Sequence, residues 1–164
     1  LARCLCWYAR GGPRYEATHA RGLLSVIVGI GTDVVVIARM RALYDRWGDR
    51  LVNRILGEQE RQVFQARLGR GQAGLSRAVS YLAKRFAAKE AVGKALGCGL
   101  SSPMSLHSLQ VLNNAAGAPQ AVAQKGLASY LSERGLVVHI SVSDEQDLAQ
   151  AFAIVESQPP LSSH

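Results

Sequence analysis

The chain has 164 residues, 48% of them hydrophobic, and a formal net charge of +7. This length fits one domain that buries about two-thirds of its unfolded surface, and the positive charge indicates an anionic partner. Three cysteines and four scattered histidines form neither a disulfide framework nor a zinc-binding spacing, and no apolar run is long enough to span a bilayer, so we expect a cytoplasmic protein without a membrane span.

The two ends of the chain differ in composition from the rest. Residues 1–25 are rich in arginine and poor in acidic residues, and they lack the hydrophobic core of a signal peptide. We expect them to be a flexible leader outside the fold, with a transit-like segment as the alternative. Residues 158–164 carry two prolines and two serines, and we expect a disordered tail there. The single domain would then cover residues 26–157.

The first predicted element is a strand over residues 26–36, which is dense in β-branched residues. Gly29 and Gly31 resemble the start of a dinucleotide-binding fingerprint, but its third glycine is replaced by Val34, which counts against a Rossmann fold. Asp33 is the unusual residue, because an ionised carboxylate in an apolar strand needs a cation or a fixed donor. The alternative is an aspartate that caps a turn at the strand end.

An amphipathic helix is predicted next, at about 37–47. In it Arg39 and Arg46 alternate with Met40 and Leu43. This pattern suits a surface that docks an acidic helix through arginines and an apolar patch. A solvated basic face, with Met40 and Leu43 in the core, fits the pattern equally well.

The later elements separate this first strand from the other strands by helices, which predicts an α+β fold with non-local strand pairing. The predicted elements are a short helix at about 57–68, a long helix at about 77–97, strands near 106–112 and 119–123, a helix near 123–134, and a hairpin of about 136–143 with 149–156.

The long helix carries the most informative residues. Glu90 continues an apolar stripe next to Phe86, so its carboxylate must be protonated, paired with a cation or bound to a metal. Lys94 lies one turn further on, and Gly93 costs about 1 kcal/mol of helix stability, which hints at a close approach of other backbone. We interpret Glu90 and Asp33 as ligands of one divalent cation. A Glu90–Lys94 surface pair is the alternative.

These segments together resemble the bacterial holo-acyl-carrier-protein synthases, which are small phosphopantetheinyl transferases. The resemblance implies that family's α+β fold, with a small mixed or antiparallel sheet packed on a long central helix. The matching residues are Gly29 to Asp33, Ile37, Arg39, Arg54 to Leu56, Glu60, Leu82 to Ala91, Lys94 to Gly97, Gly117 to Pro119, His139 to Ser143 and Ala151 to Glu156.

In the resembled family, two acids hold a magnesium ion that also binds the pyrophosphate of coenzyme A. A serine of acyl carrier protein attacks the phosphorus next to the pantetheine arm, and adenosine 3′,5′-bisphosphate leaves. The proton acceptor stays open between Glu90, Asp33 and a metal-bound water. The resemblance implies Asp33 and Glu90 as metal ligands, Asp33, Glu90 and Lys94 as catalytic residues, Arg85, Lys94, Gly97, Gly99 and His139 as coenzyme-binding residues, and Arg39, Met40, Leu43 and Arg46 as the carrier-docking surface.

The resemblance also implies a homotrimer, because the family's active site lies between neighbouring subunits. Two residues depart from the family pattern, since Cys98 replaces a usual threonine and Asp144 replaces a histidine that many members have. The alternative for Asp144 is a solvated hairpin turn.

Two other functions remain as alternatives. One is a non-catalytic basic domain that binds nucleic acid, which the scattered aromatic residues do not favour. The other is a nucleotide-dependent oxidoreductase, which the incomplete glycine fingerprint does not favour.

Overall fold

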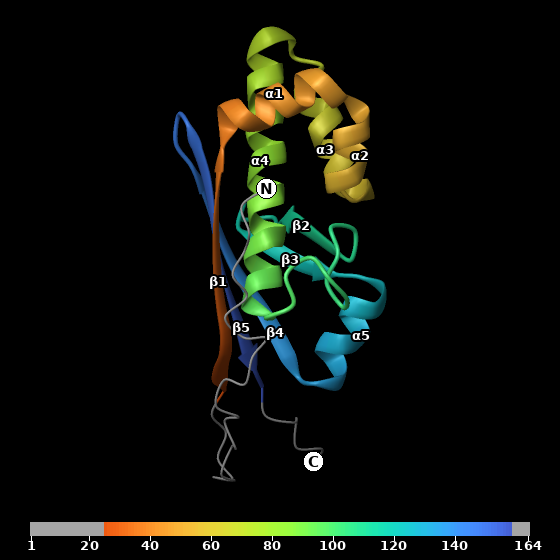
Figure 1. The fold of residues 1–164 in the computed structure, drawn as a ribbon, viewed down its shortest axis with the longest axis vertical. Helices are drawn as coiled ribbons and strands as arrows, with labels where there is room; N and C mark the ends of the chain where they lie inside the picture. Colours follow the sequence, from red (N-terminus) through yellow and green to blue (C-terminus); the bar gives the residue numbers. More distant parts are fainter. Residues whose placement is uncertain (1–24, 159–164) are drawn as a thin grey trace.

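The computed structural model describes residues 25–158. The predicted leader and tail lie, except for Ser25 and Gln158, outside this part of the chain. Figure 1 shows the arrangement of the elements, which in chain order are β1 (Val26–Val36), α1 (Ile37–Trp47), α2 (Asp49–Ile55), α3 (Glu58–Leu68), α4 (Gly71–Ala95), β2 (Leu109–Asn113), β3 (Pro119–Ala123), α5 (Lys125–Glu133), β4 (Leu136–Asp144) and β5 (Leu148–Ser157).

Strand β5 is the centre of an antiparallel three-stranded sheet with the order β1-β5-β4, and β2 pairs with β3 in a separate antiparallel sheet. In the main sheet Asp33 lies opposite Ala151, which lies opposite Val142. The prediction of an α+β fold is thereby confirmed, with antiparallel pairing throughout these two sheets. None of the helices in residues 25–158 is long and apolar enough to cross a membrane.

Helix α4 runs along one face of the main sheet (Figure 1). The residues of β5 alternate accordingly: Ala151 and Ala153 are buried under α4, whereas Phe152 points away and is 40% exposed. On β1, Ile30 and Val34 are likewise exposed. The main sheet therefore has an inner face that packs on α4 and an outer face that carries exposed apolar side chains.

The glycines of β1 allow α4 to approach this closely. A Cβ added at Gly29 would overlap the carbonyl oxygen of Ala95, and one added at Gly31 would overlap that of Ala91. Both glycines lie inside β1 and not in a turn between a strand and a helix. Their role here is close strand–helix packing, which agrees with the argument against a dinucleotide-binding fingerprint.

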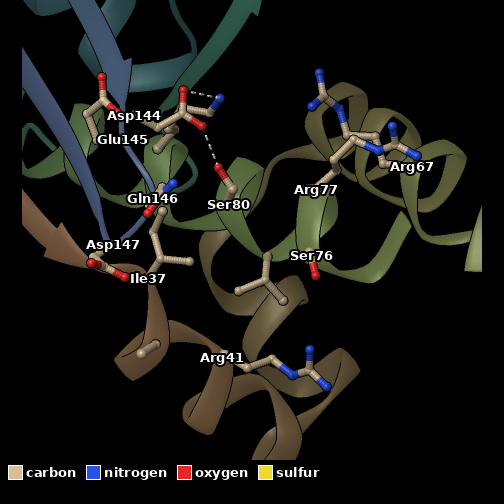
Figure 2. A pocket seen from close by; sticks show the side chains of 13 residues that line it. Ile37, Arg41, Arg67, Ser76, Arg77, Ser80, Asp144, Glu145, Gln146 and Asp147 are labelled. Atoms are coloured by element: carbon tan, nitrogen blue, oxygen red, sulfur yellow. Dashed lines mark hydrogen bonds and ion pairs between the residues drawn. The ribbon is translucent and has the colours of Figure 1, made fainter. Parts of the chain in front are cut away.

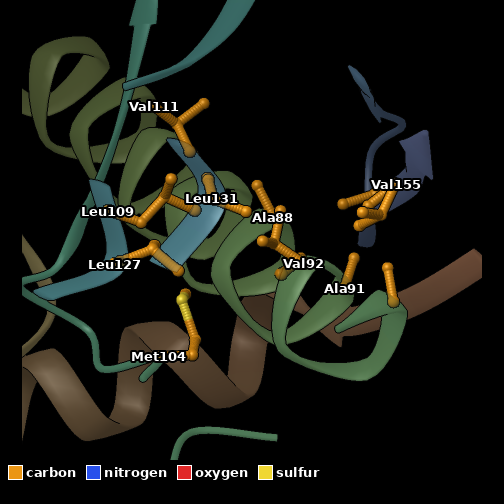
Figure 3. Close-up of a cluster of buried hydrophobic side chains, with 13 residues drawn as sticks. Ala88, Ala91, Val92, Met104, Leu109, Val111, Leu127, Leu131 and Val155 are labelled. Atoms are coloured by element: carbon orange, nitrogen blue, oxygen red, sulfur yellow. The ribbon is translucent and has the colours of Figure 1, made fainter. Parts of the chain in front are cut away.

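Two hydrophobic clusters lie along α4. Figure 3 shows the lower cluster, which α4 builds with the second sheet, α5 and β5 through Ala88, Ala91, Val92, Met104, Leu109, Val111, Leu127, Leu131 and Val155. The upper cluster joins α4 to α1, α2 and α3 and includes Met40, Val52, Ile55, Leu56, Phe64, Val79 and Leu82. Because both clusters share α4, the position of this helix depends on every other layer of the fold.

Several predicted boundaries are wrong. Helix α2 was not predicted, and α4 begins at Gly71 instead of residue 77. Gly74 is buried against the end of α3, where its missing side chain permits a tight helix–helix turn that compensates for its poor helix propensity. Strand β2 begins at Leu109 instead of residue 106, because Ser105 and Ser108 hydrogen-bond to each other's amide with their hydroxyls and form a turn.

Candidate active site

Asp33 and Lys94 meet between β1 and α4. The carboxylate of Asp33 lies on the inner face of the sheet, and its Oδ1 accepts a hydrogen bond from Nζ of Lys94 at 2.8 Å. Nζ of Lys94 also donates to the carbonyl oxygen of Thr32 at 2.9 Å. The two charged side chains remain 17% and 30% exposed, so the pair is open to a ligand from solvent.

Glu90 belongs to the same group of charges. It lies one helical turn before Lys94 and is half-buried. Burial raises the pKa of the Glu90 carboxyl, the negative charge of Asp33 raises it further, and the ammonium of Lys94 lowers it. The structure therefore brings together the two acids that the sequence analysis interpreted as partners, although they are separated by much of the chain.

The group has the donor chemistry of a site for a hard divalent cation. Its ligands would be carboxylate oxygens, which magnesium prefers, and magnesium commonly takes only one or two protein carboxylates and completes its shell with waters and substrate phosphates. Residues 25–158 contain no group of three or more histidine, cysteine or acidic residues that could hold a metal ion. The carboxylates of Asp33 and Glu90 have the donor chemistry that the implied magnesium ion prefers, and their binding of one ion stays a prediction.

Arg85 lies elsewhere on α4 and is only 6% exposed. Its guanidinium stacks on the ring of Tyr81 at 4.2 Å, and its NH2 group donates to Oδ1 of Asn113 at 2.6 Å. These contacts hold the second sheet against α4 and leave little of the side chain exposed. The predicted contact of Arg85 with coenzyme A stays a prediction.

The glycine-rich turn after α4 differs from the expected phosphate-binding loop. Gly97 and Gly99 have left-handed φ angles of 73° and 58°. The amide of Gly97 donates to the carbonyl of Lys94, and the amides of Cys98 and Gly99 both donate to that of Gly93. These amides close the end of the helix, where the dipole repels anions, so the expectation that they bind phosphates is not supported.

The expectation for Gly93 is supported. A Cβ at this position would overlap the carbonyl oxygen of Gly99, so only glycine lets the turn fold back onto the helix.

His139 lies on the outer face of the main sheet. Its neighbours Val138 and Ile140 pack toward the lower cluster, whereas His139 is exposed, with its Nε2 2.8 Å from Oε2 of Glu156. Hydrogen bonds from Ser25 and His139 lower the pKa of Glu156. Since Asp33 lies on the inner face, one chain does not bring His139 together with the predicted metal ligands.

On helix α1 the structure divides the predicted docking residues. Met40 is 3% exposed and belongs to the upper cluster, so its assignment to the docking surface is wrong. Arg39, Leu43 and Arg46 are exposed. Trp47, which the sequence analysis did not assign to this surface, is also exposed and carries the guanidinium of Arg46 at 5.1 Å from its ring centre.

A cleft of about 490 Å³ lies between α1, the first half of α4 and the β4–β5 turn. Figure 2 shows the side chains of Arg41, Arg67 and Arg77 around it, with Asp144 and Asp147 on the side of the turn. The cleft therefore has basic side chains on the helices and acidic side chains on the β4–β5 turn.

Asp144 has a structural role at this cleft. Its carboxylate accepts hydrogen bonds from Nζ of Lys84 at 2.9 Å and from Oγ of Ser80 at 2.7 Å (Figure 2). Burial acts to raise the pKa of Asp144, but these hydrogen bonds and the charge of Lys84 lower it on balance. The acidic pair at 144–145 is therefore more than a solvated turn, because Asp144 ties the hairpin to α4.

Sequence reasoning missed one buried charged pair, Glu60 and Lys89, which lies directly behind Glu90 on α4. The spacing of Gly57 and Glu60 is a weak signal for a carboxylate that caps α3, and this cap is present. Nothing in the sequence marks Lys89 as a buried partner.

Two acids and a lysine that meet between the first strand and the long helix of an α+β domain suit a phosphate-containing substrate bound with a divalent cation. The family model described as the 4′-phosphopantetheinyl transferase superfamily matches residues 29–154. The chain belongs to this family.

Named relatives support the same assignment. Holo-[acyl-carrier-protein] synthase of Methylibium petroleiphilum is 46% identical over 133 residues, which cover 81% of this chain and 98% of the relative. The crystal structure of holo-[acyl-carrier-protein] synthase from Neisseria meningitidis matches with a TM-score of 0.71 and 37% identity over 80% of this chain and all of the other.

A holo-(acyl-carrier-protein) synthase of Bacillus anthracis, solved in complex with CoA (3′,5′-ADP), matches with a TM-score of 0.65 and 32% identity over 80% of this chain and 98% of the other. These relatives favour the transferase prediction over the nucleic-acid-binding and oxidoreductase alternatives.

Proposed function

We propose that this chain transfers the 4′-phosphopantetheine group from coenzyme A to a serine of acyl carrier protein and releases adenosine 3′,5′-bisphosphate. The observation that carries the proposal is the group of Asp33, Glu90 and Lys94 between β1 and α4, within a family whose named relatives are holo-acyl-carrier-protein synthases. The B. anthracis relative, which was solved with the coenzyme, supports coenzyme A as the co-substrate.

Magnesium is the proposed metal, with Asp33 and Glu90 as its protein ligands. When bound, the ion would neutralise charge on the pyrophosphate and polarise the phosphorus that the serine attacks. Lys94 contributes a positive charge next to both carboxylates, where it can hold a phosphate oxygen. The acceptor of the serine proton stays open between Glu90, Asp33 and a water molecule.

The carrier protein is proposed to dock on α1. Arg39 and Arg46 supply exposed positive charge. The apolar side chains of Leu43, which lies between the two arginines in sequence, and of Trp47, which follows Arg46, are also exposed. Positive charge on this surface would attract an acidic partner and increase the association rate.

A homotrimer is part of the proposal. It is supported by the outer face of the main sheet, where Ile30, Val34 and Phe152 expose apolar surface of the kind that marks protein interfaces. His139 lies on this same face. In an assembly that covers this face, His139 of one subunit would contact the coenzyme A that is bound at Asp33 and Glu90 of the neighbouring subunit.

The remaining parts of the proposal are the cytoplasmic location and the domain limits. A reducing compartment is supported by the cysteine usage, and residues 26–157 are proposed as the transferase domain because the family match falls inside them.

The proposal is tested by incubating the protein with coenzyme A, magnesium and apo acyl carrier protein and then weighing the carrier by mass spectrometry. The expected result is a mass gain of one phosphopantetheine group that disappears when the acceptor serine is replaced by alanine. If none of the tested carrier proteins gains mass, with either magnesium or manganese, the proposal is contradicted.

A further inference from the structure

Glu60 and Lys89 form an ion pair that is completely buried between α3 and α4. Nζ of Lys89 lies 2.6 Å from Oε2 of Glu60, and both side chains are 0% exposed. The pair does not touch solvent and therefore has no direct contact with a substrate.

The hydrogen bonds of the pair join five segments of the chain. Lys89 also donates to the carbonyl oxygens of Ile55, at the end of α2, and Leu106, before β2, both at 2.7 Å. Glu60 accepts from the amide of Gly57 at 2.7 Å and from that of Val111, in β2, at 2.8 Å. All three protons of the ammonium and both carboxylate oxygens are used, so the pair fixes α4 in rotation as well as in distance.

Lys89 and Glu90 are consecutive in α4, so their side chains diverge by about 100° around the helix axis. Lys89 points to α3 and β2, while Glu90 shares the other side of the helix with Lys94, which hydrogen-bonds to Asp33 on β1. On the β1 side, Gly31 lets the helix backbone lie directly against the strand. The helix is thus held from two sides, and a rotation of α4 would move Glu90 and Lys94 away from Asp33.

Stability alone does not explain such a pair. Removing two charges from water is unfavourable, and apolar residues of similar volume often stabilise a core as well or better. Apolar contacts are not directional and would allow α4 to rotate. The five hydrogen bonds, four to backbone groups and one between the two side chains, define a single orientation of the helix.

We propose that Glu60 and Lys89 are positioning residues, which orient α4 so that Glu90 and Lys94 face Asp33. The inference rests on the proposed function of that site. Residues that orient metal ligands from behind typically change metal affinity or activity by about 10- to 100-fold when they are altered.

The test compares Glu60→Asp and Lys89→Met with Leu127→Ala. Glu60→Asp keeps the charge but shortens the side chain, so the pair must stretch or α4 must turn. Leu127→Ala is the matched control, because Leu127 is fully buried in the lower cluster with Ala88 and Ala91 but has no part in the hydrogen-bond network. For each variant the melting temperature, kcat, the KM for carrier protein and the Kd for Mn²⁺ alone, by electron paramagnetic resonance, are measured.

We expect Glu60→Asp to lower kcat and to weaken Mn²⁺ binding by about 10-fold each, with an unchanged KM for carrier protein, at a temperature where the variant is folded. Lys89→Met should lower both further. Leu127→Ala should lower the melting temperature and leave kcat and the Mn²⁺ affinity of the folded protein unchanged.

Wild-type kcat and Mn²⁺ affinity in a folded Glu60→Asp or Lys89→Met variant would overturn the positioning role. So would equal losses in Leu127→Ala, or a failure of both pair variants to fold, since the pair would then serve folding alone. An inactive wild-type protein would instead contradict the proposed function, and the Mn²⁺ measurement would still report on the positioning.

Discussion

Lys94 on α4 and Asp33 on β1 are separated by 61 residues in the chain and joined by a 2.8 Å hydrogen bond between their charged groups. The pair lies beside Glu90, whose pKa responds to both charges. This relationship places the proposed chemistry at the contact between the first strand and the long helix.

Replacing Asp33 by asparagine is expected to lower kcat by about 100-fold or more, because a metal ligand and its charge are worth several kcal/mol to a phosphoryl-type transfer. The measurement is the rate at which holo carrier protein appears by mass spectrometry, together with the Kd for Mn²⁺. Asp49→Asn, which alters an exposed acid at the start of α2, is the control and should keep nearly full activity. A fully active Asp33→Asn variant would show that this carboxylate is not a ligand.

Gly31→Ala tests the close packing of β1 on α4. The new methyl group would overlap the carbonyl oxygen of Ala91, so we expect the free energy of unfolding to fall by about 3 kcal/mol and activity to fall with it. Gly126→Ala is the matched control. It lies in α5 with open space around its Cα, and the same change there should stabilise the protein by about 0.5 to 1 kcal/mol. Denaturant unfolding measures both, and equal effects at the two positions would refute the packing argument.

Arg39→Glu tests the docking surface. The reversed charge should repel an acidic carrier and raise its KM by about 10-fold, while the KM for coenzyme A stays the same. Arg134→Glu, an exposed charge reversal at the end of α5, controls for the change in net charge. Steady-state kinetics with each substrate varied in turn gives both constants, and a loss confined to coenzyme A would exclude α1 as the docking helix.

The pH dependence of stability should reveal the environment of Glu90. Because the folded state raises the pKa of this carboxyl above its ordinary value of 4.5, ionised Glu90 destabilises the fold at neutral pH. With divalent metals chelated, Glu90→Gln should therefore be more stable than the wild type above the raised pKa. The difference should shrink as the pH falls toward 4.5 and be absent below it.

Thermal melts from pH 4 to pH 8 provide this measurement. The same raised pKa predicts that Mn²⁺ binding by the wild type weakens at a higher pH than binding to an exposed carboxylate would, because protons and metal compete for Glu90. A stability difference that is independent of pH would contradict the shift.

Much of this site could be predicted from the sequence, because its signals are local. The β-branched run marked β1, the alternation of charged and apolar residues marked α1, and solvation alone singled out Asp33 and Glu90 as acids that need a partner. The structure brings these two acids together.

What sequence reasoning missed depends on packing between distant segments. The pattern in α1 left open which apolar residue faces the core, and only the arrangement of α2 and α3 decides that Met40 is buried while Leu43 is exposed. The ion pair of Glu60 and Lys89 is likewise invisible without the fold. The sequence also does not indicate which face of the main sheet α4 covers, and therefore not that His139 lies on the face away from Asp33.

The placement of Asp33 and His139 on opposite faces of the sheet has a genetic consequence. If neighbouring subunits share each site, a chain with Asp33→Asn and a chain with His139→Ala are both impaired alone, for different reasons. Assemblies that mix the two chains regain some sites in which intact acids meet an intact histidine. Co-expression of the two defective alleles should then restore transferase activity, which is interallelic complementation. A site confined to one chain would allow no such restoration.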